Sequence, residues 1–128
     1  MAQVKIFGLY HSLKPIQSQL SDILHSCLVD SMNLPENKRF HRFFHMNKDD
    51  FYYPNDRSEK YTIIEISMFE GRSIDVKKKL ILLIFERFTI LGIEANDIEI
   101  TIYETPKNNW GIRGLPGDEL NLNYKVDI

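Results

Sequence analysis

The stretch Phe69-Glu70-Gly71-Arg72-Ser73 marks the point where an apolar strand ends and a long helix begins. Residues 62–69 alternate between two faces, one of them lined by isoleucine and methionine, as a strand does. Gly71 lets the backbone turn, and Ser73 is a favourable residue to cap the N-terminus of a helix. The pattern therefore predicts a strand over residues 62–69 and a helix from residue 74 to about residue 91, where Gly92 ends it.

Arg72 stands at this strand-to-helix corner, beside the free N–H groups of the helix start. A guanidinium and unpaired amides at one corner suit a carboxylate ligand. The alternative is a solvated arginine in an ordinary turn. Taken alone, these five residues fit that alternative better.

The first half of the chain repeats this order of elements. Residues 2–9 alternate as a strand, residues 15–32 carry an apolar helical stripe, and residues 39–46 form a second, aromatic-rich strand. The stripe consists of Ile16, Leu20, Ile23, Leu24, Cys27 and Leu28. We expect Cys27 in the core and His25 on the solvent side of this helix. Residues 47–60 are polar and turn-rich, which indicates a loop.

After the second helix, residues 97–104 read as a fourth strand, and the glycine-containing stretch around Trp110 reads as a loop. Residues 119–127 alternate strictly between apolar and polar side chains, which predicts a half-buried C-terminal strand. We interpret the chain as one domain over residues 1–128 that contains two βαβ repeats, at 1–46 and 61–104.

Two such repeats related by a local two-fold predict an α+β fold, a duplicated βαβ with a four-stranded mixed sheet and two helices on one face. The other face of the sheet would be bare, although it carries phenylalanine and tyrosine. Leu82 and Phe85 are also expected on the outer side of the second helix. Both features favour a closed homo-oligomer that covers these surfaces.

The composition of the chain argues against some classes of function. The chain has 128 residues, 43% hydrophobic content and a net charge of −2. That charge gives no electrostatic case for binding nucleic acid or an anionic membrane. One cysteine, no signal-peptide pattern and no apolar run of membrane-spanning length lead us to expect a cytoplasmic protein.

The duplicated βαβ with Glu70-Gly71-Arg72-Ser73 entering a helix resembles the tautomerase superfamily. The resemblance extends through Leu91-Gly92-Ile93, Asn96-Asp97 and Trp110-Gly111-Ile112-Arg113-Gly114. The whole chain is similar to the longer members, such as the malonate semialdehyde decarboxylase branch, where Leu34-Pro35-Glu36-Asn37-Lys38-Arg39-Phe40 has a counterpart. The resemblance implies a homotrimer with sites between subunits, a small carboxylate substrate or ligand, and no cofactor.

The resemblance also implies roles for individual residues. In the family the first residue after Met1 is a proline whose amine is the catalytic base or acid, and here that residue is Ala2. Lys38 stands where the decarboxylase branch carries an aspartate, and Glu70 where it carries a second arginine. Arg72 would bind the substrate carboxylate. Trp110 and Arg113 would fall in the hairpin that closes the pocket, and His41 would border it.

Two hypotheses remain open on these residues. In the first the protein is an isomerase or decarboxylase, in which removal of Met1 frees the Ala2 amine, or Lys38 supplies the amine itself. In the second the chain keeps the fold and the carboxylate pocket without the chemistry, as a binding or structural trimer. If Met1 is retained, Ala2 has no free amine, which favours the second.

His41 and His45 lie on one strand face, four residues apart. No cysteine or carboxylate motif supplies the further ligands that a zinc site needs. We therefore interpret both as structural residues and predict no metal site.

Overall fold

The computed structural model describes residues 2–128. Its helices are α1 (Tyr10–Leu13), α2 (Gln17–Met32) and α3 (Ile74–Arg87). Its strands are β1 (Ala2–Leu9), β2 (His41–Met46), β3 (Thr62–Phe69), β4 (Ile98–Thr105), β5 (Gly111–Ile112) and β6 (Leu115–Pro116). Six short 3-10 segments join them within the described residues, at Lys14–Ile16, Lys48–Asp50, Phe88–Leu91, Ala95–Asp97, Lys107–Asn109 and Gly117–Glu119.

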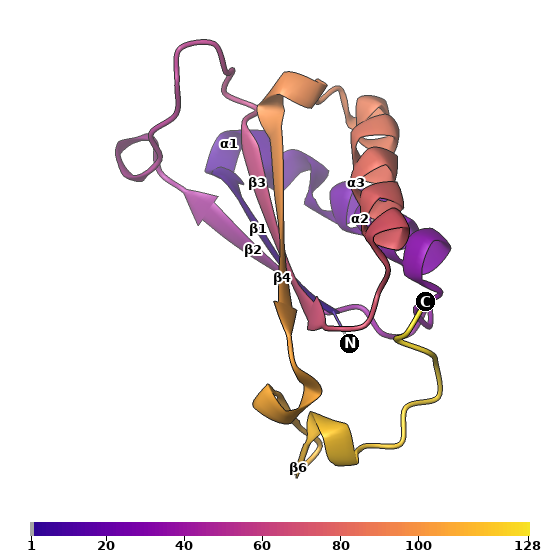
Figure 1. The fold of residues 1–128 in the computed structure, drawn as a ribbon. Coiled ribbons are helices and arrows are strands. Elements are labelled where there is room, and N and C mark those ends of the chain that lie inside the picture. Colours follow the sequence, from indigo (N-terminus) through magenta and orange to yellow (C-terminus); the bar gives the residue numbers. More distant parts are fainter. Residues whose placement is uncertain (1) are drawn as a thin grey trace.

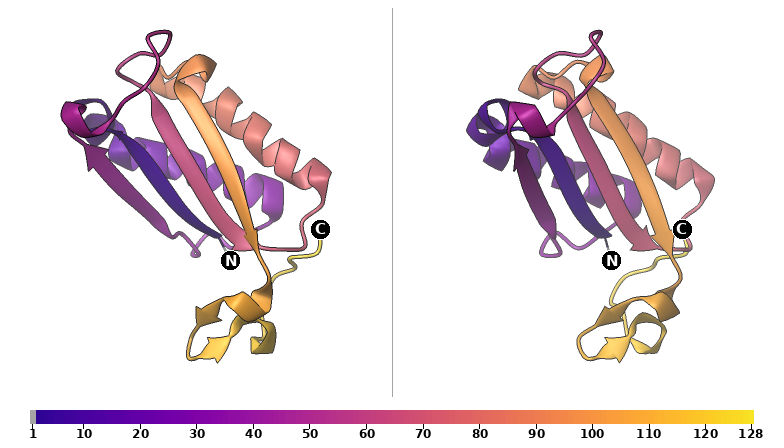
Figure 2. Two further views of the ribbon diagram at one scale, coloured as in Figure 1. Left: turned by 60° about the vertical axis from the view of Figure 1, so that its left-hand side comes forward. Right: turned by 90° about the vertical axis from the view of Figure 1, so that its left-hand side faces the viewer.

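Four strands form one mixed sheet in the order β2-β1-β3-β4. The pairs β1–β2 and β3–β4 are parallel, and the central pair β1–β3 is antiparallel. Each parallel pair is joined through a helix, and both α2 and α3 pack on the same face of the sheet (Figures 1 and 2). The duplicated βαβ arrangement and the α+β fold predicted from the sequence are therefore confirmed.

The two central strands have the predicted bounds because each alternates so regularly. Val4 and Ile6 of β1, and Ile64 and Ile66 of β3, are fully buried against the helices. The hydrophobic core that they form also holds Leu24 of α2 and, at further positions, Leu28, Met32, Leu80, Ile84 and Phe88. Burial of these side chains supplies the main favourable term in folding.

The helices differ from the prediction at their ends. The first begins earlier, as the short α1, and is broken by Pro15 in a 3-10 turn before α2 starts. The second changes to a 3-10 turn at Phe88–Leu91, and Gly92, with φ of 74°, ends it as predicted. Leu82 is 66% exposed, as expected, whereas Phe85 packs partly against the core.

The C-terminal strand predicted over residues 119–127 does not form. The strands that follow β4 in the described chain are the short β5 and β6, and residues 120–128 run without regular structure. Their burial nevertheless alternates as predicted, with Leu122, Tyr124 and Val126 turned inward and their polar neighbours exposed. The apolar period is satisfied by packing against the end of β3 and not by a ladder of hydrogen bonds.

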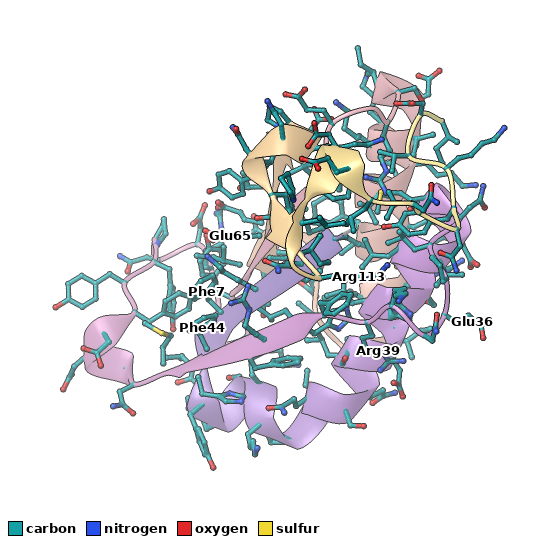
Figure 3. All side chains as sticks on the ribbon, turned by 90° about the horizontal axis from the view of Figure 1, so that it is seen from below. Phe7, Glu36, Arg39, Phe44, Glu65 and Arg113 are labelled. Atoms are coloured by element: carbon teal, nitrogen blue, oxygen red, sulfur yellow. The ribbon has the colours of Figure 1, made fainter. Side chains whose placement is uncertain are left out.

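The face of the sheet opposite the helices is open to solvent. Phe7 of β1 and Phe44 of β2 stack there, with ring centroids 4.8 Å apart. Both residues are labelled in the view from below in Figure 3. Phe44 is 39% exposed and Tyr103 of β4 is 49% exposed. None of the helices in the described part of the chain is both long and apolar enough to cross a membrane.

Candidate functional site

The corner between β3 and α3 is built as the sequence predicts. Gly71 has φ of 130°, a conformation that residues with a side chain rarely adopt. The Oγ atom of Ser73 accepts a hydrogen bond from the Val76 N–H at 3.2 Å and caps α3. Glu70 continues the sheet by donating its N–H to the Thr105 oxygen at 3.0 Å. These contacts fix the backbone on both sides of Arg72.

Arg72 is not a solvated side chain, since only 4% of its surface is exposed. Its Nη1 atom donates to the Phe69 carbonyl at 3.2 Å, while its Nε and Nη2 atoms have no hydrogen-bond partner among the described residues. Burial lowers the pKa of Arg72 from its ordinary value, and Tyr124, Glu104 and Asp127 oppose that effect. A buried guanidinium with two unused donors is costly unless an acceptor joins it. This side chain is therefore suited to an anion.

Ala2 lies at the same end of the sheet. It pairs with Met68 across the antiparallel β1–β3 ladder, next to the corner, and is 4% exposed. Its side chain belongs to the core cluster on the helix side of the sheet. The topology thus brings the start of β1 beside the strand end that carries Arg72 (Figure 1).

Trp110 stands directly before the β5–β6 hairpin. The Trp110 ring meets the fully buried Phe69 ring edge-on, with centroids 4.9 Å apart. Arg113 sits at the hairpin turn with φ of 55° and is exposed. Trp110 is therefore linked to the corner through Phe69, whereas Arg113 stands exposed at the hairpin turn.

Tyr124 is a site residue that the sequence analysis missed. It is half-buried, packs against both hydrophobic clusters, and interacts electrostatically with Arg72 and Arg113. Burial raises the pKa of the Tyr124 phenol, and the two arginines oppose that rise. The available signal was its place on the apolar side of the alternating C-terminal residues.

Lys38 and His41 are less closely joined to this corner. Lys38 is half-buried in the turn before β2, where its N–H donates to the Pro35 oxygen at 3.0 Å. The His41 ring lies under α2, with Nδ1 2.8 Å from the Ser21 hydroxyl oxygen. The turn does reach β1, because the Val4 N–H donates to the Phe40 oxygen at 2.9 Å.

His25 corrects another expectation, because it is buried at 4% exposure and does not face solvent. Its Nε2 atom lies 2.8 Å from the Glu36 carbonyl, so the helix holds the turn that carries Lys38. Cys27 is fully buried, and burial raises the pKa of its thiol to about 11. It is a core residue, as predicted, and not a nucleophile.

A surface cavity of about 540 Å³ lies at the opposite end of the sheet. It is lined by His11, Ser12, Ile16, Ser58, Glu59, Lys60, Leu91 and Ile93. The polar groups there satisfy one another, since Ser12 donates to the Glu59 carbonyl and Lys60 to the Gly92 carbonyl. The Arg72 corner, which has hydrogen-bond donors without a partner among the described residues, is the stronger candidate for a functional site.

Comparison with known proteins agrees with this fold. The profile of a family described as tautomerase enzyme matches residues 38–113, more than half of the chain. The chain belongs to the tautomerase family. The match includes Lys38, His41, Arg72, Trp110 and Arg113, but not Ala2.

Individual relatives of this tautomerase-family chain are distant. A 2-hydroxymuconate tautomerase from Comamonas testosteroni is 35% identical over 57 residues, which cover 44% of this chain and 90% of the relative. Malonate semialdehyde decarboxylase superposes with a TM-score of 0.80 at 19% identity, covering 92% of this chain and 99% of that one. A fused 4-OT symmetric trimer gives 0.77 at 17% identity, covering 91% and 96%. At these identities the structural likenesses establish the fold.

Proposed function

We propose that this tautomerase-family protein binds a small 2-oxo or enol carboxylic acid and acts on it as an isomerase or decarboxylase. The observation that carries the proposal is Arg72, which is 4% exposed yet has two donors without a partner among the described residues. A carboxylate would fill both donors with charge-assisted hydrogen bonds. The same guanidinium would stabilise negative charge on an enolate oxygen during proton transfer.

The proton-transfer group is proposed to be an amine at this end of the sheet. Removal of Met1 would free the Ala2 amine, and an α-amino group titrates near about 8. Nearby cations such as Arg72 and Lys38 would favour its neutral form. A neutral amine could take the enol proton from oxygen and, as ammonium, return a proton to carbon.

Decarboxylation would use the same amine differently. A primary amine condenses with the oxo group of a 3-oxo acid, releases water and forms a protonated imine, which accepts the electron pair of the breaking C–C bond. Carbon dioxide leaves, the resulting enamine takes a proton on carbon, and water regenerates the amine. Lys38 is the second candidate for this amine. Trp110 and Phe69 would exclude bulk water from the reacting groups.

We propose that the working unit is a homotrimer with its sites between subunits, and that Arg113 and His41 border the pocket from the hairpin and from β2. The open sheet face, with the stacked Phe7 and Phe44, supports an assembly that covers it. The fused 4-OT relative is described as a symmetric trimer. A further subunit could place its own charged groups near Arg72.

A binding or structural trimer without catalysis is the second candidate. It is favoured by Ala2, which stands where the family carries its catalytic proline, and by Glu70, which stands where the decarboxylase branch carries an arginine. In that case the Arg72 pocket would bind a carboxylate without turning it over.

Ketonisation of phenylenolpyruvate separates the two candidates. We expect the wild-type protein to accelerate the reaction over buffer and Arg72→Ala to lose the excess rate. Arg87→Ala is the matched control, because it removes a guanidinium that pairs with Asp30 on the helix surface. If wild type and Arg72→Ala both equal the buffer rate across several enols and 3-oxo acids, the catalytic proposal is wrong for these substrates.

The intact mass of untagged protein assigns the amine. A mass lacking one methionine supports Ala2 as the N-terminal residue. A retained Met1 removes Ala2 from the mechanism and leaves Lys38, which Lys38→Ala then tests by the same assay.

A further inference from the structure

The unused donors of Arg72 are sealed inside the molecule. Two surface cavities next to the corner, of about 480 and 470 Å³, are lined by corner residues, by residues on either side of the hairpin and by C-terminal residues, but not by Arg72 itself. With 4% of its surface exposed, the guanidinium offers a ligand from solvent almost no direct approach. Something must move before an anion reaches Nε and Nη2.

The C-terminal segment, residues 120–128, is what covers the corner. Val126 is 3% exposed and packs on Phe69, and a Cβ atom placed on Gly71 would lie 3.2 Å from Val126 Cγ1. The same Cβ atom would collide with Asp127 Oδ1. Figures 1 and 2 show the segment leaving the hairpin and returning beside the start of α3.

This cover is held by side chains more than by backbone. Its backbone hydrogen bonds are local, from Leu120 N–H to the Gly117 oxygen and from Ile128 N–H to the Val126 oxygen. Among the described residues other than Tyr124, no backbone-to-backbone hydrogen bond joins residues 121–127 to the sheet or to a helix. A segment anchored by few buried side chains opens at a small cost in free energy. Val126, its most buried residue, is the main anchor.

Tyr124 belongs to this cover and packs on the cluster of Phe69 and Val126. It interacts electrostatically with Arg72 and with Arg113, and its ring packs on the cluster that contains Ala2. A hydroxyl can donate a hydrogen bond to an anion that Arg72 binds. Its packing on the Phe69 cluster and its electrostatic interaction with Arg72 make Tyr124 the candidate for such a donor.

We propose that residues 120–128 are a lid over the proposed carboxylate site, on which this inference rests. The lid opens to admit a small carboxylate to Arg72, and Tyr124 donates a hydrogen bond to the carboxylate once the lid closes. Lid opening precedes binding, so the site is gated. Val126 determines how often the lid opens, whereas Tyr124 determines how tightly the closed site holds its ligand.

Trp110, the one tryptophan of the chain, reports on this event, because it shares a cluster with Phe69, Leu122, Tyr124 and Val126. The experiment is stopped-flow mixing of the full-length protein with pyruvate at constant ionic strength, followed by tryptophan fluorescence. In the wild type we expect the observed rate to level off at high pyruvate, at the rate of lid opening.

Val126→Ala removes part of the anchor and should raise that plateau about tenfold. Tyr124→Phe should leave the plateau unchanged and weaken equilibrium binding about tenfold, the effect of losing one hydrogen bond to a charged group. Tyr52→Phe, at a residue 88% exposed in the loop before β3, is the matched control and should bind as wild type does. Urea unfolding of each variant verifies that it is folded, and Val126→Thr replaces Val126→Ala if the latter is not.

The outcomes separate the lid from the site beneath it. If Arg72→Ala abolishes binding while Val126→Ala and Tyr124→Phe behave as wild type, the carboxylate site stands and the lid is refuted. If Arg72→Ala binds pyruvate as wild type does, or if wild type gives no saturable change, both the carboxylate site and the lid are overturned. A linear rate with no plateau in wild type also refutes the gating.

Discussion

The imidazole ring of His41 lies edge-on to the ring of His25, with 5.8 Å between centroids and 71° between planes. Each ring has one nitrogen bonded, His41 to Ser21 and His25 to the Glu36 carbonyl. The other two nitrogens, His25 Nδ1 and His41 Nε2, are buried without a partner among the described residues. A proton added to this pair would be buried beside another imidazole.

Acid should therefore destabilise the protein through His41. Burial, followed by the charges of His25 and Arg39, lowers its pKa from 6.5 to about 4, while Asp22 opposes the shift. The unfolded chain takes up the proton first, so the stability from neutral His41 is complete above about pH 6.5 and is lost as pH falls through about 4. The full loss corresponds to about 3 kcal/mol.

Urea unfolding between pH 7 and pH 4 tests this contribution in wild type and His41→Gln. We expect the free energy of unfolding to fall more steeply in wild type, by up to about 3 kcal/mol. His11→Gln, which alters an exposed histidine paired with Glu59, should keep the wild-type slope. Equal slopes in wild type and His41→Gln would contradict the assignment.

Strands β1 and β3 could be predicted residue for residue because both are buried on one face only. Their strict alternation leaves one register that puts Val4 and Ile64 in the core. The corner was equally predictable, since Gly71 and Ser73 each perform a local task that few residue types perform as well. Local backbone chemistry therefore predicted where Arg72 stands.

Burial of polar side chains was not predictable in the same way. His25 looked solvent-facing on the helical pattern, yet it is buried because the turn after α2 folds over it and offers the Glu36 carbonyl. Arg72 looked solvated on its own five residues, yet it is 4% exposed, at a corner against which the C-terminal segment packs from some 50 residues later. These outcomes depend on contacts between distant parts of the chain, which no local pattern contains.

The C-terminal segment shows how a correct pattern gave a wrong element. The alternation of residues 120–126 predicted which side chains turn inward, and Leu122, Tyr124 and Val126 do so. A strand also needs a partner for its backbone, and no strand of the described chain pairs with this segment. The alternation of apolar and polar residues specifies which face of a segment is buried, but not which part of the chain packs on that face.

Gly71→Ala should be costly for two separable reasons. The backbone there has φ of 130°, which an alanine adopts only with strain, and its Cβ would collide with Asp127. We expect a loss of about 2 to 4 kcal/mol in the free energy of unfolding, measured by urea titration. Gly114→Ala is the control for strain alone, because φ is 80° and no atom lies within 4 Å of its Cβ.

The difference between these two variants measures the contact with the C-terminal segment. Gly111→Ala, with no positive φ and open space around its Cβ, should be nearly neutral. If Gly71→Ala is no more destabilising than Gly114→Ala, the C-terminal segment does not press on the corner.

The Ser73 cap of α3 should contribute to the free energy of unfolding as much as helix caps usually do. Ser73→Ala removes the hydroxyl that accepts the Val76 N–H, so we expect a loss of about 1 kcal/mol in unfolding free energy. Ser73→Asp, which keeps an acceptor and adds a favourable charge at the helix start, should restore it. Thermal unfolding measures both variants. An unchanged midpoint in Ser73→Ala would mean that the hydroxyl caps nothing in solution.

Replacing Phe44 by lysine tests the proposed trimer directly. Phe44 stacks on Phe7 on the open sheet face, where an added charge would be buried in any assembly that covers this face. We expect wild type to sediment at about three times the 15.1 kDa chain mass and Phe44→Lys to shift to the single-chain mass. Ile74→Lys places the same charge at a residue 67% exposed at the start of α3 and should leave the assembly intact. Wild type sedimenting as a single chain would exclude sites shared between subunits and leave the Arg72 pocket to be completed by its own chain.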